Sequence, residues 1–223
     1  MLRSAVLLWM LSLPFISQAE STQLAQIFPT SCHFSGTFTQ NKHIEGISFP
    51  LQSEGDFYFS CNFGLVWNTI TPFPEALLYA NARMNYRVDE QGKIEEMPST
   101  TRYVMSQFFL RLLKGDAEYF ENEFSVSALQ ENQGTLLVPK SDFMKRGLKH
   151  IKVNKRLLSD SANSVQLDIE ISDATNQVTH IVISDILEYE IEDRQAAVEQ
   201  CLELYPRPLQ WCRLMRSPGY YNR

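Results

Sequence analysis

Four cysteines are the residues of this chain whose chemistry is most readily predicted: Cys32, Cys61, Cys201 and Cys212. An even number of cysteines in an exported protein predicts two disulfides, and four cysteines allow three pairings. A zinc site is the alternative, but no CxxC motif occurs and the four histidines stand isolated in the sequence. We therefore expect no metal and no cofactor.

Residues for hydrolytic chemistry are not arranged in a recognisable pattern. No GxSxG motif occurs, and no histidine stands beside a nucleophile or at a metal-ligand spacing. We interpret Glu118, Glu121 and Glu123 as members of a polar loop rather than as an acid/base pair. The expectation is that the protein is not an enzyme.

The amino terminus predicts export. Arg3 precedes an apolar run over residues 5–16, and Ser17-Gln18-Ala19 places small residues where a signal peptidase reads. The run is short for a membrane span, so a retained anchor is the less favoured alternative. We expect a signal peptide over residues 1–19, cleaved after Ala19, a main domain over 20–192 and an extension over 193–223.

The charge of the chain bears on its partners. The formal net charge is −6, which argues against nonspecific binding of nucleic acid. Against this background, residues 140–156 contain seven Lys or Arg and one acid, Asp142. We interpret this stretch as a solvated strand pair; contact with anionic lipid headgroups or an acidic partner is the alternative.

Alternating residues over 34–41, 51–61 and 63–69 predict three strands, each with one apolar and one wet face. Aromatic residues form the apolar faces, and glycines among them would let a sheet bend. A hairpin turning near Gly46 would pair residues whose numbers sum to about 93. That register places Cys32 opposite Cys61, which leaves Cys201 and Cys212 to close a small loop in the extension.

Further elements complete the expected fold. Spacings of three and four predict a helix from Thr101, as a cap, to Gly115, as a stop, and a short helix over 196–204. More strands are expected over 76–80, 84–88, 93–97, 124–129, 135–139, 147–157, 164–172, 177–183 and 187–191, the last with Glu188, Glu190 and Glu192 on one exposed face. The fold class is mainly β (α+β), an open antiparallel barrel.

In this order and spacing, several segments resemble the LolA-like family of periplasmic outer-membrane lipoprotein carriers. The matching segments are FSGTFTQ at 34–40, SEGDF at 53–57, GLVW at 64–67 with Pro72 following, FFLRLLKGD at 108–116, LLVPK at 136–140 and VTHIVI at 178–183. Together they extend over about residues 24–183.

The resemblance implies a curved, half-open antiparallel β-barrel closed by a helical lid around a hydrophobic cavity. The residues that would line a lipid-binding cavity are Phe38, Phe57, Phe59, Phe63, Leu65, Trp67, Met105, Phe108, Phe109 and Leu112. It also implies a periplasmic monomer with an acylated lipid or lipoprotein cargo, an inner-membrane donor and an outer-membrane acceptor. A lipid-sensing or interaction module of the envelope, and a filled core with a fixed helix, are the alternatives.

Two departures from the family pattern affect these expectations. Members carry an arginine six residues before the strand-three tryptophan, at a position used in lid closure and cargo transfer. Cys61 occupies that position here. The extension over 193–223, with its own cysteine pair, is the second departure.

Overall fold

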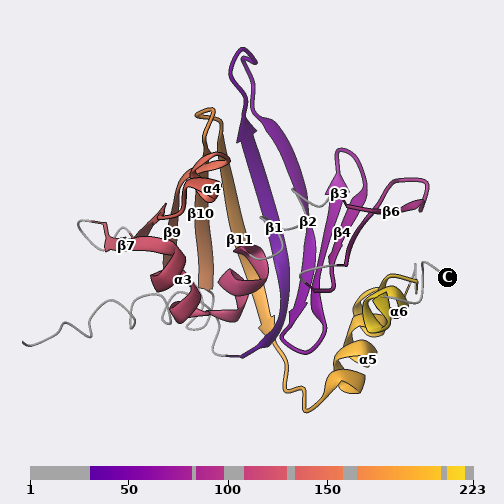
Figure 1. Ribbon diagram of the computed structural model, residues 1–223. Coiled ribbons are helices and arrows are strands. Elements are labelled where there is room, and N and C mark those ends of the chain that lie inside the picture. Colours follow the sequence, from indigo (N-terminus) through magenta and orange to yellow (C-terminus); the bar gives the residue numbers. More distant parts are fainter. Residues whose placement is uncertain are drawn as a thin grey trace, which may run out of the picture.

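The computed structural model describes residues 31–81, 84–97, 108–129, 134–157, 165–206 and 210–218. One antiparallel sheet of eleven strands runs through the described part of the chain, in the order β6-β5-β4-β3-β2-β1-β11-β10-β9-β8-β7 (Figure 1). Its outer strands, β6 and β7, do not pair with each other, so the expected open, mainly β fold is confirmed. The strands are β1 (His33–His43), β2 (Leu51–Ser60), β3 (Gly64–Thr71), β4 (Glu75–Tyr79), β5 (Asn85–Val88), β6 (Ile94–Glu96), β7 (Phe124–Ala128), β8 (Thr135–Pro139), β9 (Leu148–Leu157), β10 (Val165–Asp173) and β11 (Val178–Glu188).

The hairpin of β1 and β2 has the register that the sequence predicts. Phe34 pairs with Phe59, and Phe38 pairs with Gly55. Gly46, in the connection, has φ +82°, a conformation that glycine adopts without steric cost. Cys32 and Cys61 lie just beyond the paired residues, with Cα atoms 5.5 Å apart, and form a disulfide.

Glycines in this hairpin make room for the aromatic rings of the opposite strand. A Cβ on Gly55 would lie 1.9 Å from the Asn68 carbonyl oxygen and 2.8 Å from the Phe38 ring. A Cβ on Gly36 would lie 2.9 Å from the Phe57 ring. Each phenylalanine ring therefore lies over a glycine of the neighbouring strand, at a position where a larger residue would collide with the ring.

The second half of β2 and the first half of β3 bury side chains on both faces, which corrects the expectation of one wet face on these two strands; β1 keeps Thr37 and Thr39 exposed, as expected. Along β3, Leu65 and Trp67 belong to a hydrophobic cluster on one face, the inner cluster. Val66 belongs to a second cluster on the opposite face, the outer cluster. Tyr58, expected on a wet face, is fully buried in the outer cluster.

Helices cover the inner face. Residues 108–114 are helical and end at Gly115, whose φ of +66° suits glycine. α3 (Ala117–Glu123) follows, capped by the Asp116 side chain, and α4 (Asp142–Lys145) links β8 to β9. The segment with Glu118, Glu121 and Glu123 is thus mainly helix and not loop, because Asp116 satisfies its first N–H groups and Phe120 packs into the inner cluster.

The extension packs on the outer face of the sheet through two helices, α5 (Arg194–Leu204) and α6 (Gln210–Arg216) (Figure 1). The expected helix over 196–204 is therefore present, and α6 was not predicted. Cys201 and Cys212 link α5 to α6 through a disulfide with Cα atoms 5.8 Å apart. The Tyr58 hydroxyl donates a hydrogen bond to the Ala197 carbonyl oxygen (3.1 Å) and thereby joins the sheet to α5.

One expected strand is wrong. Residues 187–191 do not form a strand of their own, because β11 pairs with β1 as far as Glu188 and the chain then leaves the sheet towards α5. The predicted signal peptide, the cap at Thr101 and Met105 lie outside the described residues. No helix in the described part of the chain is long and apolar enough to cross a membrane.

Candidate ligand cavity

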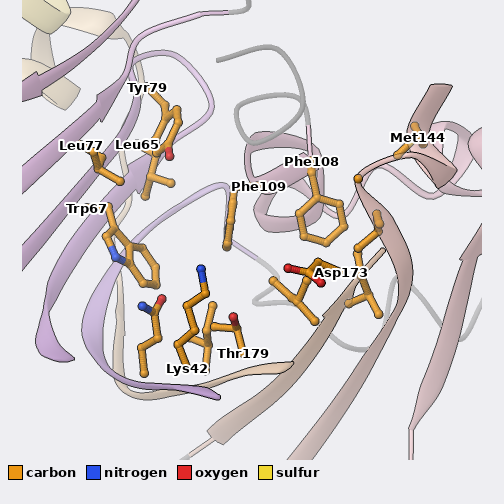
Figure 2. Close-up of a pocket in the computed structure, with 16 residues that line it drawn as sticks. Lys42, Leu65, Trp67, Leu77, Tyr79, Phe108, Phe109, Met144, Asp173 and Thr179 are labelled. Carbon is orange, nitrogen blue, oxygen red and sulfur yellow. The ribbon is translucent and has the colours of Figure 1, made fainter. Parts of the chain in front are cut away.

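A cavity of about 320 Å³ lies between the inner face of the sheet and the helix over residues 108–114 (Figure 2). Eleven of its sixteen lining residues are apolar or aromatic. They are Leu65, Trp67, Leu77, Tyr79, Phe108, Phe109, Met144, Leu148, Ile151, Ile171 and Ile181. The volume is at the lower end of the range for small-ligand sites, and the composition is typical of such sites.

Trp67 is held in place on the β3 side of the cavity. Its ring stacks on Phe38, with centroids 3.9 Å apart, and its centroid lies 5.8 Å from that of Phe57. Phe109, from the helix, lies across from it at 5.9 Å. Contacts of this kind between aromatic rings are favourable beyond the area they bury, so they stabilise the position of the Trp67 ring.

The opposite side of the cavity consists of β-branched and aliphatic residues in a cross-strand row. Ile171 of β10 pairs with Ile151 of β9 and with Thr179 of β11. Thr179 in turn pairs with Lys42 of β1. Alternate residues of a strand point to the same face, so this row places three apolar or small side chains and one lysine side by side.

The polar lining residues gather at the end of the cavity where the side chains are half-exposed: Gln40, Lys42, Asp173 and Thr179. Figure 2 shows the Lys42 ammonium and the Asp173 carboxylate directed into the cavity. Asp173 is engaged by its own turn, because its Oδ1 accepts hydrogen bonds from the Thr175 N–H (2.8 Å) and the Gln177 N–H (2.9 Å). Burial acts to raise the pKa of Asp173, but the hydrogen bond from the Thr175 hydroxyl (2.7 Å) and those from the two N–H groups outweigh it and keep the carboxylate ionised.

The closed end of the cavity is uncharged. Tyr79 is 3% exposed there. Burial, with a smaller contribution from the charge of Glu75, raises the pKa of its hydroxyl, which therefore stays neutral. The arrangement suits an elongated apolar group with a polar end directed towards Lys42.

The structure places the ten predicted cavity residues in four groups. Leu65, Trp67, Phe108 and Phe109 line the cavity. Phe38, Phe57, Phe59 and Leu112 lie behind them in the inner cluster. Phe63 belongs instead to the outer cluster, because the turn over residues 61–63 carries it to the other face. Met105 lies outside the described residues.

The lining residues of β9, β10 and β11 were missed as cavity residues. Ile151, Ile171 and Ile181 occupy alternate positions on predicted strands, so their alternation assigns them to one face. Alternation does not tell which strand curves round to face Trp67. The contribution of α4, Met144, had no signal in the sequence.

Cys61, at the position where the LolA-like family carries an arginine, forms a disulfide across the first hairpin. Cys61 is bonded to Cys32, and its backbone N–H donates to the Cys32 carbonyl oxygen at 3.0 Å. An arginine of this chain, Arg111, lies on the helix over the cavity and pairs with Asp116. Its guanidinium also lies 5.3 Å from the centre of the Tyr119 ring. Arg111 thus connects the helix over 108–114 to α3.

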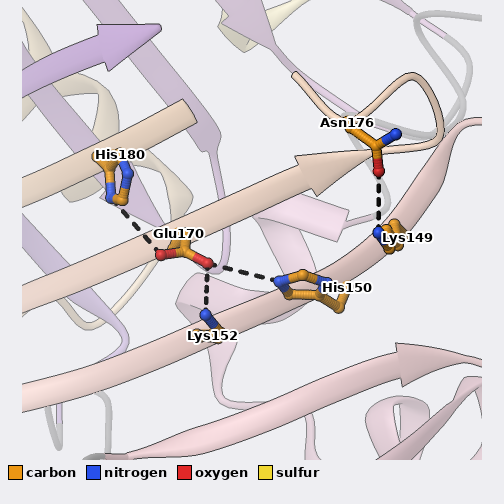
Figure 3. A network of polar contacts seen from close by, with 6 residues as sticks. All are labelled: Lys149, His150, Lys152, Glu170, Asn176 and His180. Atoms are coloured by element: carbon orange, nitrogen blue, oxygen red, sulfur yellow. Dashed lines mark hydrogen bonds and ion pairs between the residues drawn. The ribbon is translucent and has the colours of Figure 1, made fainter. Parts of the chain in front are cut away.

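Residues 150–156, the second half of the basic stretch, pair with acidic residues on the outer face of β9 and β10. Lys152 lies 2.7 Å and His150 3.4 Å from Glu170 Oε1 (Figure 3). Arg156 lies 2.6 Å from Asp168. Burial acts to raise the pKa of Glu170, but the Lys152 hydrogen bond and charge outweigh it and lower the pKa. Residues 150–156 are therefore part of a solvated strand pair, as the sequence indicated.

Comparisons with known proteins find a partial likeness to solved structures and no match by sequence. No family model matches the chain, and no curated protein matches it. A LolA superfamily protein of Nitrosomonas europaea covers 78% of this chain and 94% of its own, with 9% identity and a TM-score of 0.43. A DUF1329 family protein of Desulfovibrio piger covers 79% and 92%, with 10% identity and a TM-score of 0.46. A proposed outer membrane lipoprotein-sorting protein domain of Vibrio parahaemolyticus covers 82% and 97%, with 10% identity and a TM-score of 0.41. At this level, likeness says nothing about activity.

Proposed function

We propose that this protein is a carrier of the cell envelope that shields the acyl chain of a lipid or lipoprotein in the cavity under the helix over residues 108–114. The observation that carries the proposal is the cavity itself: about 320 Å³, apolar at its closed end and polar at its half-exposed end. A filled core would leave no such space, since protein interiors are close-packed. The proposal involves no catalytic step.

The energetics of an acyl chain favour such a carrier. Each methylene withdrawn from water contributes about 0.8 kcal/mol, so burial of about eight methylenes contributes about 6 kcal/mol before the costs of association. This supports binding strong enough to shield the chain across an aqueous space and weak enough to release it.

The polar end of the cavity would orient the cargo. Gln40, Lys42 and Thr179 offer hydrogen-bond donors there, at the position where the polar group of an inserted acyl chain would lie. An acyl chain would enter with its methyl end towards Tyr79 and Leu65. This orientation leaves the polar part of the cargo outside the cavity.

Two features support an oxidising compartment outside the cytoplasm. The first residues have the pattern of a signal peptide. Both disulfides, Cys32–Cys61 and Cys201–Cys212, are of the kind that persists in the periplasm. Together they support a periplasmic carrier.

Displacement of a fluorescent fatty acid, together with native mass spectrometry of the purified protein, tests the proposal. Ile181 and Val182 are adjacent on β11 but only Ile181 lines the cavity. We expect Ile181→Trp to fill the cavity and weaken fatty-acid binding about tenfold or more, whereas Val182→Trp leaves binding unchanged. Thermal melts of both variants serve as the control for folding. An empty wild-type protein that binds no acyl ligand would falsify the carrier function.

A lipid-sensing module is the second candidate, favoured by the same cavity. The two candidates differ in what happens after binding. A carrier moves labelled lipid between donor and acceptor vesicles, whereas a sensor binds the lipid, forms a stable complex with a membrane regulator and transfers nothing. A vesicle-transfer assay therefore decides between them.

A further inference from the structure

In the part of the chain that the structure describes, three aromatic side chains are exposed in the connections between strands, where solvent contact costs free energy. Phe49 is 80% exposed, Phe73 is 78% exposed and Phe143 is 50% exposed. They lie in the β1–β2 connection, the β3–β4 connection and α4. Ile47, Leu51 and Ile70 are exposed beside the first two, each by about half. Exposed apolar residues gathered in one region mark an interaction surface.

These segments all lie at one end of the sheet. In an antiparallel sheet, alternate connections fall at the same end, so β1–β2, β3–β4, β8–β9 and β10–β11 share one end (Figure 1). The Ala174 N–H donates to the Gly147 carbonyl oxygen at 3.3 Å, which joins two of them. We define the mouth rim as residues 44–51, 70–74 and 141–147.

The mouth rim lies at the half-exposed end of the cavity. Lys42 lies two residues before the first rim segment, and Met144 and Gly147 lie within the third. Trp67 lies three residues before the second segment. The exposed aromatic residues and the opening of the cavity are therefore at the same end of the molecule.

The charge around the third rim segment is positive, whereas the first segment carries one acid, Glu45. Residues 140–149 contain Lys140, Lys145, Arg146 and Lys149 against one acid, Asp142, in a chain of net charge −6. All four basic side chains are exposed. The Arg146 guanidinium lies 5.7 Å from the centre of the Phe143 ring, so a cation and an aromatic tip are adjacent. Aromatic residues beside basic ones are the combination that binds the interface of an anionic membrane.

We propose that the mouth rim docks on the surface of an anionic phospholipid bilayer, with Phe49, Phe73 and Phe143 in the headgroup region. The tips come from three separate connections, and a fluid bilayer accepts such projections without matching pockets. A folded protein partner would need a shaped recess for each tip. Docking turns the opening of the cavity towards the bilayer; the use of this contact to load cargo rests on the proposed function.

Cosedimentation with vesicles tests the docking. The wild-type protein is expected to bind vesicles that contain phosphatidylglycerol and to bind phosphatidylcholine vesicles more weakly. Phe49→Ser with Phe73→Ser is expected to weaken binding about tenfold or more. The matched control is Leu187→Ser, because Leu187 is 61% exposed but lies at the far end of β11. All of these side chains are exposed, so folding is expected to be retained.

A second pair of substitutions tests the charge. Lys145→Gln with Arg146→Gln is expected to weaken binding to the anionic vesicles about tenfold, and added salt is expected to do the same to the wild-type protein. Fatty-acid binding in free solution should be unchanged in every rim variant. A wild-type protein that binds vesicles but no fatty acid would contradict the proposed carrier function and not the docking.

Three outcomes would overturn the docking. They are a wild-type protein that binds no protein-free vesicle, a Leu187→Ser variant that loses as much binding as the aromatic double variant, and binding only to membranes that contain envelope proteins. The last outcome would assign the mouth rim to a protein partner.

Discussion

At the scale of single residues, the aromatic side of the cavity depends on positions that carry no side chain. Trp67 stacks on Phe38, and the Phe38 ring lies over Gly55 on the neighbouring strand. The glycine thus sets the position of two aromatic residues that define the shape of the cavity. The same principle applies at Gly36 under the Phe57 ring.

Gly55→Ala is expected to destabilise the protein by about 2 kcal/mol or more, because its Cβ would lie 1.9 Å from the Asn68 carbonyl oxygen and would also displace the Phe38 ring. Urea denaturation gives the change in the free energy of unfolding. Gly147→Ala is the matched control: its nearest atom would be 4.0 Å away, and we expect a change within about 0.5 kcal/mol. Equal effects of the two substitutions would contradict the close approach at Gly55.

At the scale of elements, the helix over residues 108–114 and α3 form one unit above the cavity. Arg111 pairs with Asp116 across the turn at Gly115, and Asp116 Oδ1 accepts from the Tyr119 N–H (3.1 Å). Asp116 therefore holds the end of one helix and caps the next. Since a carrier must admit and release cargo, the stability of this joint bears on how easily the helices move.

The joint is expected to weaken in acid. Burial acts to raise the pKa of Asp116, but the hydrogen bonds from Arg111 and the Tyr119 N–H outweigh it, so the folded-state pKa lies below the ordinary value of 3.8. The contribution of Asp116 to stability is therefore present above that value and is lost as the pH falls through the folded-state pKa.

Asp116→Asn tests this, because asparagine retains the cap but not the charge. We expect the variant to be less stable at neutral pH by about 1 kcal/mol or less, and its stability to fall less steeply below pH 4 than that of the wild-type protein. Thermal melts across pH measure both effects. Parallel pH profiles would show that the carboxylate does not act in this way.

At the scale of the whole molecule, the part of the sheet around β2, β3 and β4 is covered on both faces. The inner cluster and the cavity lie under the helices over 108–123, whereas the outer cluster lies under α5 and α6. The Tyr205 hydroxyl donates to Asp56 Oδ1 (2.8 Å) and adds a second polar link between the extension and the sheet. The two disulfides lie in different parts of the fold: Cys32–Cys61 joins the ends of the β1–β2 hairpin, and Cys201–Cys212 joins α5 to α6.

Truncation after Glu192 is expected to expose the outer face of the sheet, including Tyr58, Val66, Leu78 and Tyr86, all of which are almost completely buried in the full chain. We expect the shortened protein to aggregate or to bind a hydrophobic dye, measured by light scattering and dye fluorescence. A monomeric, cooperatively folding truncated protein would instead make residues 193–223 a separate appendage.

Much of the fold follows from the sequence alone. Alternation over 34–61 predicts both strands of the first hairpin, and a turn near Gly46 is enough to pair Phe34 with Phe59 and Cys32 with Cys61. These are local properties, because strand alternation and a short connection determine a register without reference to the rest of the chain. The helical spacing before Gly115 is local in the same sense.

Only the tertiary structure decided which faces are covered and which space stays open. Tyr58 has the alternation of a wet-face residue but is buried, because α5 and α6, more than a hundred residues later in the chain, pack on that face. Phe63 is aromatic and was predicted to line the cavity, but it lies in the outer cluster on the other face. Alternation tells which side chains share a face, whereas a cavity depends on how far apart a curved sheet and its helices stand. That distance is set by packing across the whole molecule, which is why Ile151, Ile171 and Met144 became lining residues only in the folded chain.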